Sequence, residues 1–276
     1  MFAVFIGMYE SFFGLKEAPF NMTPDPRFVY FSRHHQEALS ALLYGVESRR
    51  GFIQITGEIG AGKTTICRTL LEKLSGRVHS SLVFNPKLSE FEILQVIVED
   101  FGIQPAGKKR KHYFDALNHF LIEQLAKGFN AVLIIDEAQL LSPKALEQVR
   151  LLSNLETSTQ KLLQIILAGQ PELKDLLSRP DLRQLKQRIA VRYHLPELSR
   201  AEVGDYVWHR LKIAGSEGNF FSEEALDVIY QLSTGIPRVI NILADRAMLA
   251  AFTQNTMVIG PSMVEYAQSD LEGVHA

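Results

Sequence analysis

The sequence feature that most constrains the fold is the octapeptide GEIGAGKT at residues 57–64, which directly follows the apolar run FIQIT. It matches the pattern G-x4-G-K-[ST], which is typical of a phosphate-binding loop between a β-strand and an α-helix. Glycines let such a loop wrap closely around phosphates, so that its N–H groups and the helix N-terminus attract anions. The residues expected to bind phosphate are Gly57, Glu58, Ile59, Gly60, Ala61, Gly62, Lys63, Thr64 and Thr65.

Three side chains of this segment have separate expected roles. The Lys63 ammonium should reach the β- and γ-phosphates of a nucleotide, and the Thr64 hydroxyl should ligate Mg²⁺. Thr65 is expected to contact the α-phosphate. The alternative is a glycine-rich turn without a ligand, and the apolar run before the loop and the helical pattern after it argue against that.

Apolar runs and helical patterns alternate between residues 51 and 195, which indicates an α/β fold. The run AVLII at 131–135 is apolar throughout, as in a strand buried on both faces of a parallel sheet. Strand–helix–strand order implies right-handed crossovers and a five-stranded parallel sheet flanked by helices. The expected strands are 52–56, 81–84, 131–135, 162–168 and 189–194, and the expected helices between them are 63–74, 91–101, 112–126 and 143–155.

From Pro196 onward the sequence contains helical patterns only. Ser199 and Glu202 have the spacing of a capping box, and Ser222 precedes two glutamates that suit a helix N-terminus. Pro237 is placed to begin a long helix. The sequence therefore predicts an α/β nucleotide-binding domain over residues 1–195 and a small all-helical lid domain over residues 196–276.

Two carboxylates, Asp136 and Glu137, follow the buried run 131–135 directly. Because burying charge is costly, a buried strand that ends in two acids favours a functional explanation. Asp136 is expected to hold Mg²⁺ through water, and Glu137 to polarise the attacking water as general base. The alternative is a solvated carboxylate pair at a strand end.

Polar side chains also follow two other expected strands. Gln170 comes after Gly169, at the sheet edge where α/β proteins bind ligands. It is expected to orient the water or to sense the γ-phosphate, and a locally bonded loop amide is the alternative. Asn85 occupies the equivalent edge and could hold Glu137 inactive until a partner binds.

Three arginines are candidates for contact with nucleotide phosphates. Arg183 and Arg188 precede the last expected strand, and either could act in trans on the γ-phosphate of a neighbouring subunit, with Arg188 slightly favoured. Arg238 lies in the first turn of an expected helix, where the helix dipole disfavours a cation and an anionic ligand would favour it. A solvated helix face is the alternative for the first two, and a surface arginine for the third.

The charge balance and the single cysteine exclude several other classes. With 29 Lys and Arg against 31 Asp and Glu, the chain offers no overall attraction to nucleic acid or anionic lipid. Cys67 alone cannot form an internal disulfide framework or a cysteine-built zinc site, and it is expected to pack as a small apolar residue. No apolar run approaches the roughly 20 residues that a transmembrane helix needs. The basic run 108–111 is expected to be a solvated loop.

These segments together resemble the AAA+ ATPases, and more narrowly the ExeA/GspA-type ATPases of general secretion and the related ATPase of mannose-sensitive pilus biogenesis. The resemblance extends from about Met8 to Leu271. The segments that carry it are 8–26, YGV at 44–46, the P-loop, DEAQ at 136–139, AGQPEL at 168–173 and GIPR at 235–238.

The resemblance implies Mg²⁺-dependent ATP hydrolysis by a homo-oligomer, such as a ring, that helps to assemble a secretion or type IV pilus machine. It implies a membrane-protein partner, and a cytoplasmic location or a peripheral one at the inner membrane. It also suggests that the segment 20–30 covers one face of adenine and the helical lid the other. Since secretion ATPases of this type continue into a transmembrane segment and a peptidoglycan-binding region, a sequence ending at Ala276 is expected to be a stand-alone member, with Met8 as its initiator.

Two other functions remain open at this point. Transposition ATPases of the TniB/TnsC kind share this core and an Asp-Glu-Ala-Gln segment, so a DNA-dependent regulator is the alternative. The net charge of −2 speaks mildly against it. The second open function is a switch that binds ATP and scarcely hydrolyses it. Glu137 argues against this function, because a protein that only binds ATP needs no general base at that position.

Overall fold

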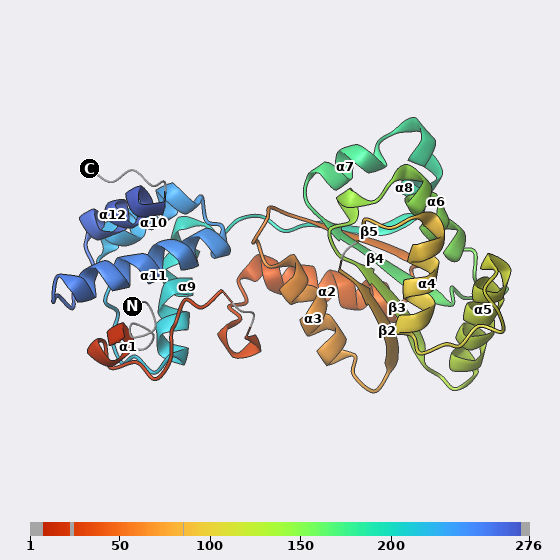
Figure 1. The fold of residues 1–276 in the computed structure, drawn as a ribbon, viewed down its shortest axis with the longest axis horizontal. Helices are drawn as coiled ribbons and strands as arrows, with labels where there is room; N and C mark the ends of the chain where they lie inside the picture. Colours follow the sequence, from red (N-terminus) through yellow and green to blue (C-terminus); the bar gives the residue numbers. More distant parts are fainter. Residues whose placement is uncertain (1–7, 23–24, 85, 272–276) are drawn as a thin grey trace. The chain divides into compact units, whose positions relative to one another are not determined.

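One parallel sheet organises the α/β part of the chain (Figure 1). The computed structural model describes residues 8–22, 25–84 and 86–271. Within these residues five strands lie in the order β2-β3-β4-β1-β5, and every neighbouring pair is parallel. The prediction of a five-stranded parallel sheet is therefore confirmed. The strands are β1 (Phe52–Thr56), β2 (Val78–Val83), β3 (Asn130–Ile135), β4 (Leu163–Gly169) and β5 (Ile189–His194).

Burial explains which strands the apolar pattern located best. The central strands β1, β3 and β4 are buried at every residue, and their apolar runs predicted them to within a residue at each end. The edge strand β2 begins at Val78, three residues before the prediction, because His79 and Ser80 are partly or fully exposed and polar. An edge position that faces solvent leaves no apolar signal in the sequence.

Helices cover both faces of the sheet. Leu133 and Ile135 of β3 belong to a core cluster with α4, α5 and α6. On the other face α2 approaches β1 so closely that a Cβ on Gly45 would lie 2.5 Å from Ile53 Cδ1. This is why a residue without a side chain stands there. The helices of this part are α2 (Arg33–Glu47), α3 (Lys63–Lys73), α4 (Glu90–Asp100), α5 (Arg110–Ala126), α6 (Pro143–Leu152), α7 (Glu172–Leu177) and α8 (Arg183–Arg188), with 3-10 turns η2 (Ala138–Leu140) and η3 (Pro180–Leu182).

Local capping fixes where several helices begin. Ser89 and Glu92 form a capping box at α4, and Ser142 Oγ accepts the N–H of Ala145 before α6. One prediction is wrong in part: α5 begins at Arg110, so the second half of the basic run 108–111 is helical.

The remaining residues form a helical unit with its own core. Its helices are α9 (Arg200–Ile213), α10 (Glu223–Ser233), α11 (Pro237–Thr253) and α12 (Pro261–Leu271), preceded in sequence by the short α1 (Met8–Phe12) and η1 (Pro26–Phe28). Ser199 and Glu202 make the predicted capping box, and Ser222 caps α10. Residues Val207, Ile229 and Ala244 are buried in this core. No helix in the described ranges is both long and apolar enough to cross a membrane.

The N-terminal segment packs with the helical unit. The chain divides into one unit of Met1–Ser32, Ile59–Gly62 and Pro196–Ala276, and a second of Arg33–Glu58 and Lys63–Leu195. Phe13 packs against Phe220, and Phe20, almost fully buried, packs against Phe221. The division into domains of 1–195 and 196–276 stays a prediction. The aromatic packing differs from it, because residues 13 and 20 pack with residues of the helical unit.

Candidate active site

Three loops that follow β1, β3 and β4 bring the P-loop, the two carboxylates and Gln170 to one edge of the sheet. Strands β1, β3 and β4 are neighbours, and all three end at this edge because they are parallel. The P-loop connects β1 to α3, the carboxylate pair follows β3, and Gln170 follows β4 (Figure 1). The topology therefore places residues from distant parts of the sequence at one position.

The P-loop backbone needs its glycines. Gly60 and Gly62 have φ of 83° and 102°, in the left-handed region that side chains disfavour. A Cβ on Gly57 would lie 2.7 Å from the carbonyl oxygen of Leu195. Of the other predicted loop residues, Ala61 is buried, Glu58 and Thr65 are partly buried and Ile59 is exposed.

The Lys63 side chain turns into the loop. Its Nζ donates to the carbonyl oxygens of Gly57 at 2.8 Å and of Glu58 at 2.9 Å. The side chain is buried, and burial lowers the pKa of Lys63, although the carboxylates of Glu137, Asp136 and Glu58 favour its charged form. A desolvated cation on a curved backbone segment is a binding arrangement for phosphate oxygens.

The two predicted Mg²⁺ residues contact each other directly. Thr64 Oγ1 donates to Asp136 Oδ2 at 2.5 Å, and Asp136 Oδ1 accepts the N–H of Glu137 at 2.9 Å. A hydroxyl and a carboxylate side by side are the hard oxygen donors that Mg²⁺ prefers. In the described ranges no cluster of three or more His, Cys, Asp or Glu could hold a metal on its own. The donor set fits a cation that also takes ligands from phosphates and water.

Glu137 lies in a strained turn and is held by two amides. Its φ of 52° is in the left-handed region, which costs on the order of 1 kcal/mol or more in a non-glycine residue and occurs at functional sites. Its Oε2 accepts Gln139 Nε2–H at 2.6 Å and Gln170 Nε2–H at 3.0 Å. The Gln170 N–H donates to Gln139 Oε1 at 3.0 Å. Gln139 is a site residue that the sequence analysis did not predict. The signal that could have indicated it is an amide side chain two positions after Glu137.

In the described ranges, none of the three arginine side chains forms a hydrogen bond or ion pair with another predicted site residue. Arg188 Nη1 donates to Ser153 Oγ at 2.8 Å and to Asn154 Oδ1 at 2.6 Å, beside the end of α6. Arg183 is exposed, and its side chain has no hydrogen bond or ion pair to another described residue. Arg238 is exposed in the first turn of α11 and lies against the P-loop, since a Cβ on Gly60 would lie 2.5 Å from Arg238 Cβ. Asn85 lies outside the described residues.

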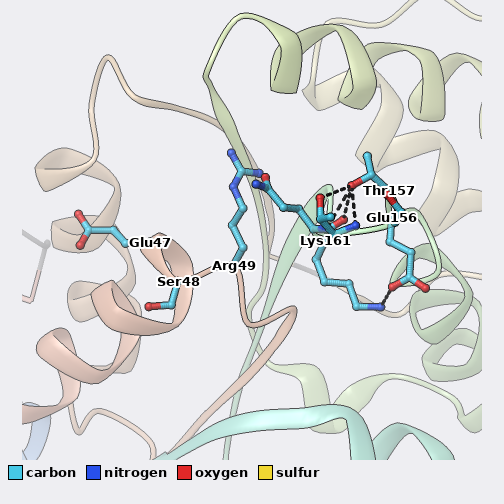
Figure 2. Close-up of a pocket in the computed structure, with 9 residues that line it drawn as sticks. Glu47, Ser48, Arg49, Glu156, Thr157 and Lys161 are labelled. Atoms are coloured by element: carbon cyan, nitrogen blue, oxygen red, sulfur yellow. Dashed lines mark hydrogen bonds and ion pairs between the residues drawn. The ribbon is translucent and has the colours of Figure 1, made fainter.

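A pocket of about 700 Å³ lies at the opposite edge of the sheet, where β1 and β4 begin (Figure 2). It is lined by residues 47–49 and 156–161, and contains none of the predicted site residues. Arg49 Nη2 donates to the carbonyl oxygen of Phe129, while its buried Nη1 has no hydrogen-bond partner in the described ranges, and Lys161 pairs with Glu156. The carboxyl edge, where P-loop and carboxylates meet, is therefore the candidate active site.

The fold and this site define the chain as a P-loop ATPase of the AAA+ class. A family model described as an AAA domain matches residues 46–177. Over 270 residues the chain is 44% identical to general secretion pathway protein A of Aeromonas hydrophila, an alignment that covers 97% of this chain and 49% of that protein. Nearly the whole chain is thus similar to general secretion pathway protein A, and it spans about half the length of that relative.

Solved structures agree on the fold. The ORC2 protein of Aeropyrum pernix, solved as ADPNP and ADP complexes, has a TM-score of 0.69 at 19% identity, covering 94% of this chain and 72% of that one. The RuvB Holliday junction branch migration motor of Thermotoga maritima has a TM-score of 0.56 at 19% identity, covering 86% and 69%. At these identities the likeness concerns the fold alone.

Proposed function

We propose that the chain is a Mg²⁺-dependent ATPase that works as a homo-oligomer and couples ATP turnover to the assembly of a secretion or type IV pilus machine. The observation that carries the proposal is the meeting of Thr64, Asp136 and Glu137 beside the buried Lys63. A hydroxyl, two carboxylates and a desolvated cation at one sheet edge are the groups that phosphoryl transfer to water requires.

Binding would begin at the P-loop. The backbone N–H groups of residues 57–65 and the Lys63 ammonium would take the phosphates, and Lys63 would exchange its two carbonyl acceptors for phosphate oxygens. Thr64 and Asp136 would hold Mg²⁺, which when bound neutralises charge on the β- and γ-phosphates.

Hydrolysis would use the carboxylate after β3. As a water oxygen attacks the γ-phosphorus, Glu137 takes a proton from that water. The bond from the γ-phosphorus to the bridging oxygen breaks, ADP keeps the electron pair, and inorganic phosphate forms. Gln170 would orient the water or contact the γ-phosphate, since its amide already reaches the Glu137 carboxylate.

Residues from outside the α/β unit would complete the site. The helical unit, residues 196–276, would act as a lid that brings Arg238 to the nucleotide. Arg188 or Arg183 of a neighbouring subunit in a ring would neutralise γ-phosphate charge. The segment 20–30 would cover one face of adenine.

The similarity to general secretion pathway protein A supports the secretion role. It favours a membrane protein of a secretion or pilus system as the partner, and a cytoplasmic or inner-membrane peripheral location. Chain composition supports no general affinity for DNA, since the net charge is −2.

The test is steady-state ATP hydrolysis with and without Mg²⁺. The parent should be active, Lys63→Ala should lose nucleotide binding, and Glu137→Gln should bind ATP and accumulate oligomers without turnover. Matched controls are Lys73→Ala and Glu72→Gln, which change exposed residues of α3 outside the site. Parental turnover by Glu137→Gln would show that the base is wrongly assigned.

Adding double-stranded DNA to the same assay separates the two function classes. Indifference to DNA supports the secretion or pilus role. If DNA stimulates ATP hydrolysis several-fold, the secretion or pilus role is contradicted and a DNA-dependent regulator of the transposition class is favoured instead.

A further inference from the structure

We propose that Gln139 is a positioning residue that holds the Glu137 carboxylate in place and links it to the Gln170 loop. The inference rests on the proposed function, in which Glu137 accepts the proton of the attacking water. It adds a third side chain, from the 3-10 turn η2, to the pair formed by Glu137 and Gln170.

The three residues form a closed ring of hydrogen bonds. Gln139 Nε2 donates to Glu137 Oε2 at 2.6 Å, and Gln139 Oε1 accepts the Gln170 N–H at 3.0 Å. Gln170 Nε2 closes the ring on the same Glu137 oxygen at 3.0 Å. Since a backbone N–H can only donate, the atom facing it is the Gln139 oxygen, and the nitrogen must then face Glu137.

Only a primary amide performs both tasks at this position. A carboxylate has no hydrogen to donate to Glu137, and an apolar side chain of the same length makes neither bond. The neighbouring backbone makes room for the amide: a Cβ on Gly169 would lie 2.6 Å from Gln139 Oε1. The small residue and the amide therefore fit each other.

The ring leaves one carboxylate oxygen available. Both amide donors go to Oε2, and Oε1 of Glu137 has no hydrogen bond from any residue in the described ranges. Oε1 is then the atom that takes a proton from water. When Gln170 turns its amide to a γ-phosphate, the bond from Gln139 remains and keeps the carboxylate in place, although Glu137 stands in a strained backbone conformation.

The test compares turnover with nucleotide affinity. Gln139→Met keeps the side-chain length and removes both bonds, so kcat should fall by about 10- to 100-fold while the dissociation constant for ATP changes less than about twofold. Gly169→Ala should also lower kcat without changing the dissociation constant for ATP, because its Cβ displaces the Gln139 oxygen. This variant replaces Gln139→Met as the test if Gln139→Met fails to fold. Gln95→Met, which removes the amide bonded to Tyr113 elsewhere in the unit, is the matched control and should keep the parental kcat.

Each outcome decides the matter. Parental kcat in Gln139→Met overturns the inference, and so does a higher kcat, which would mean that the amide restrains Glu137 in an inactive position. If the parent hydrolyses ATP and Glu137→Gln does not, an unchanged or higher kcat in Gln139→Met contradicts only the role of Gln139, and the proposed function stands. If Glu137→Gln keeps the parental rate, the proposed function fails first. A fall in ATP affinity parallel to kcat would show a structural role only.

Discussion

The Thr64 hydroxyl donates a hydrogen bond of 2.5 Å to Asp136 Oδ2, which joins two residues 72 positions apart in the sequence. Thr64 lies in the first turn of α3, and Asp136 directly follows β3. Because Asp136 is buried, the hydroxyl also satisfies a carboxylate oxygen that would otherwise have no partner there. One bond therefore stabilises the fold and places two oxygen donors for a cation.

The first prediction concerns this pair. Thr64→Val keeps the shape of the side chain and removes the hydroxyl, so Mg²⁺-dependent turnover should be lost, and unfolding should become easier by about 1–3 kcal/mol. ATP hydrolysis and thermal denaturation measure the two effects. Thr64→Ser should retain both, and Thr69→Val, on the same helix, is the control. Turnover at the parental rate in Thr64→Val would exclude the hydroxyl as a metal ligand.

The sequence located the P-loop and the Asp136–Glu137 pair because both depend on short-range spacing. The loop must join a strand to a helix through glycines at fixed positions, and the acids stand at the end of an uninterrupted apolar run. The structure brings both to one edge. Their chemical roles stay predictions.

The parts that the sequence did not predict depend on contacts between distant segments. The bond from Gln170 N–H to Gln139 crosses 31 positions, and neither residue alone signals it. The helices α7 and α8 have six residues each, too short for a clear periodic pattern or for stability in isolation. The order of the strands follows from packing and leaves no local trace.

The second prediction concerns Cys67. The thiol is buried in α3, and burial raises its pKa to about 12. At pH 8 only about one molecule in ten thousand then carries the thiolate that reacts with alkylating reagents. The folded protein should resist iodoacetamide for hours, and protein unfolded in urea should react completely. Rapid labelling of the folded protein would mean that α3 opens easily, and circular dichroism under the same conditions checks that the fold persists.

The third prediction concerns the attachment of the N-terminal segment to the helical unit. Arg210 is buried, its Nε donates to the Pro19 carbonyl at 2.5 Å, and its Nη2 donates to the Asn21 carbonyl at 3.1 Å. Its guanidinium also lies over the Phe28 ring. Arg210→Met should cost about 2–4 kcal/mol of stability, because two carbonyls lose a charged donor.

Thermal denaturation measures that loss, and limited proteolysis locates it. Cleavage near residues 19–22 should appear in Arg210→Met before cleavage elsewhere. Arg210→Lys should recover little, since an ammonium cannot reproduce the planar set of donors. The control is Lys212→Met, which changes an exposed residue of α9. Equal melting temperatures for Arg210→Met and the parent would contradict the role of this arginine.

The last prediction concerns the arginine proposed to act between subunits. Arg188 is bonded to the neutral side chains of Ser153 and Asn154, so no carboxylate in the described ranges forms an ion pair with it. A cation held without an ion pair keeps its charge available to a neighbouring phosphate. Arg188→Ala should therefore lower the rate of ATP turnover by about 10³-fold or more while ATP still binds.

Mixing two inactive variants decides whether the arginine acts in trans. Glu137→Gln subunits supply Arg188, and Arg188→Ala subunits supply Glu137, so a mixed oligomer contains complete sites and should regain activity. The same mixture made with Arg183→Ala tests the other candidate, and a mixture with Lys63→Ala in both chains controls for contaminating ATPase. Recovery with Arg183→Ala alone would transfer the role to that residue. If neither mixture recovers, each subunit completes its own site, and the oligomer serves another purpose than catalysis.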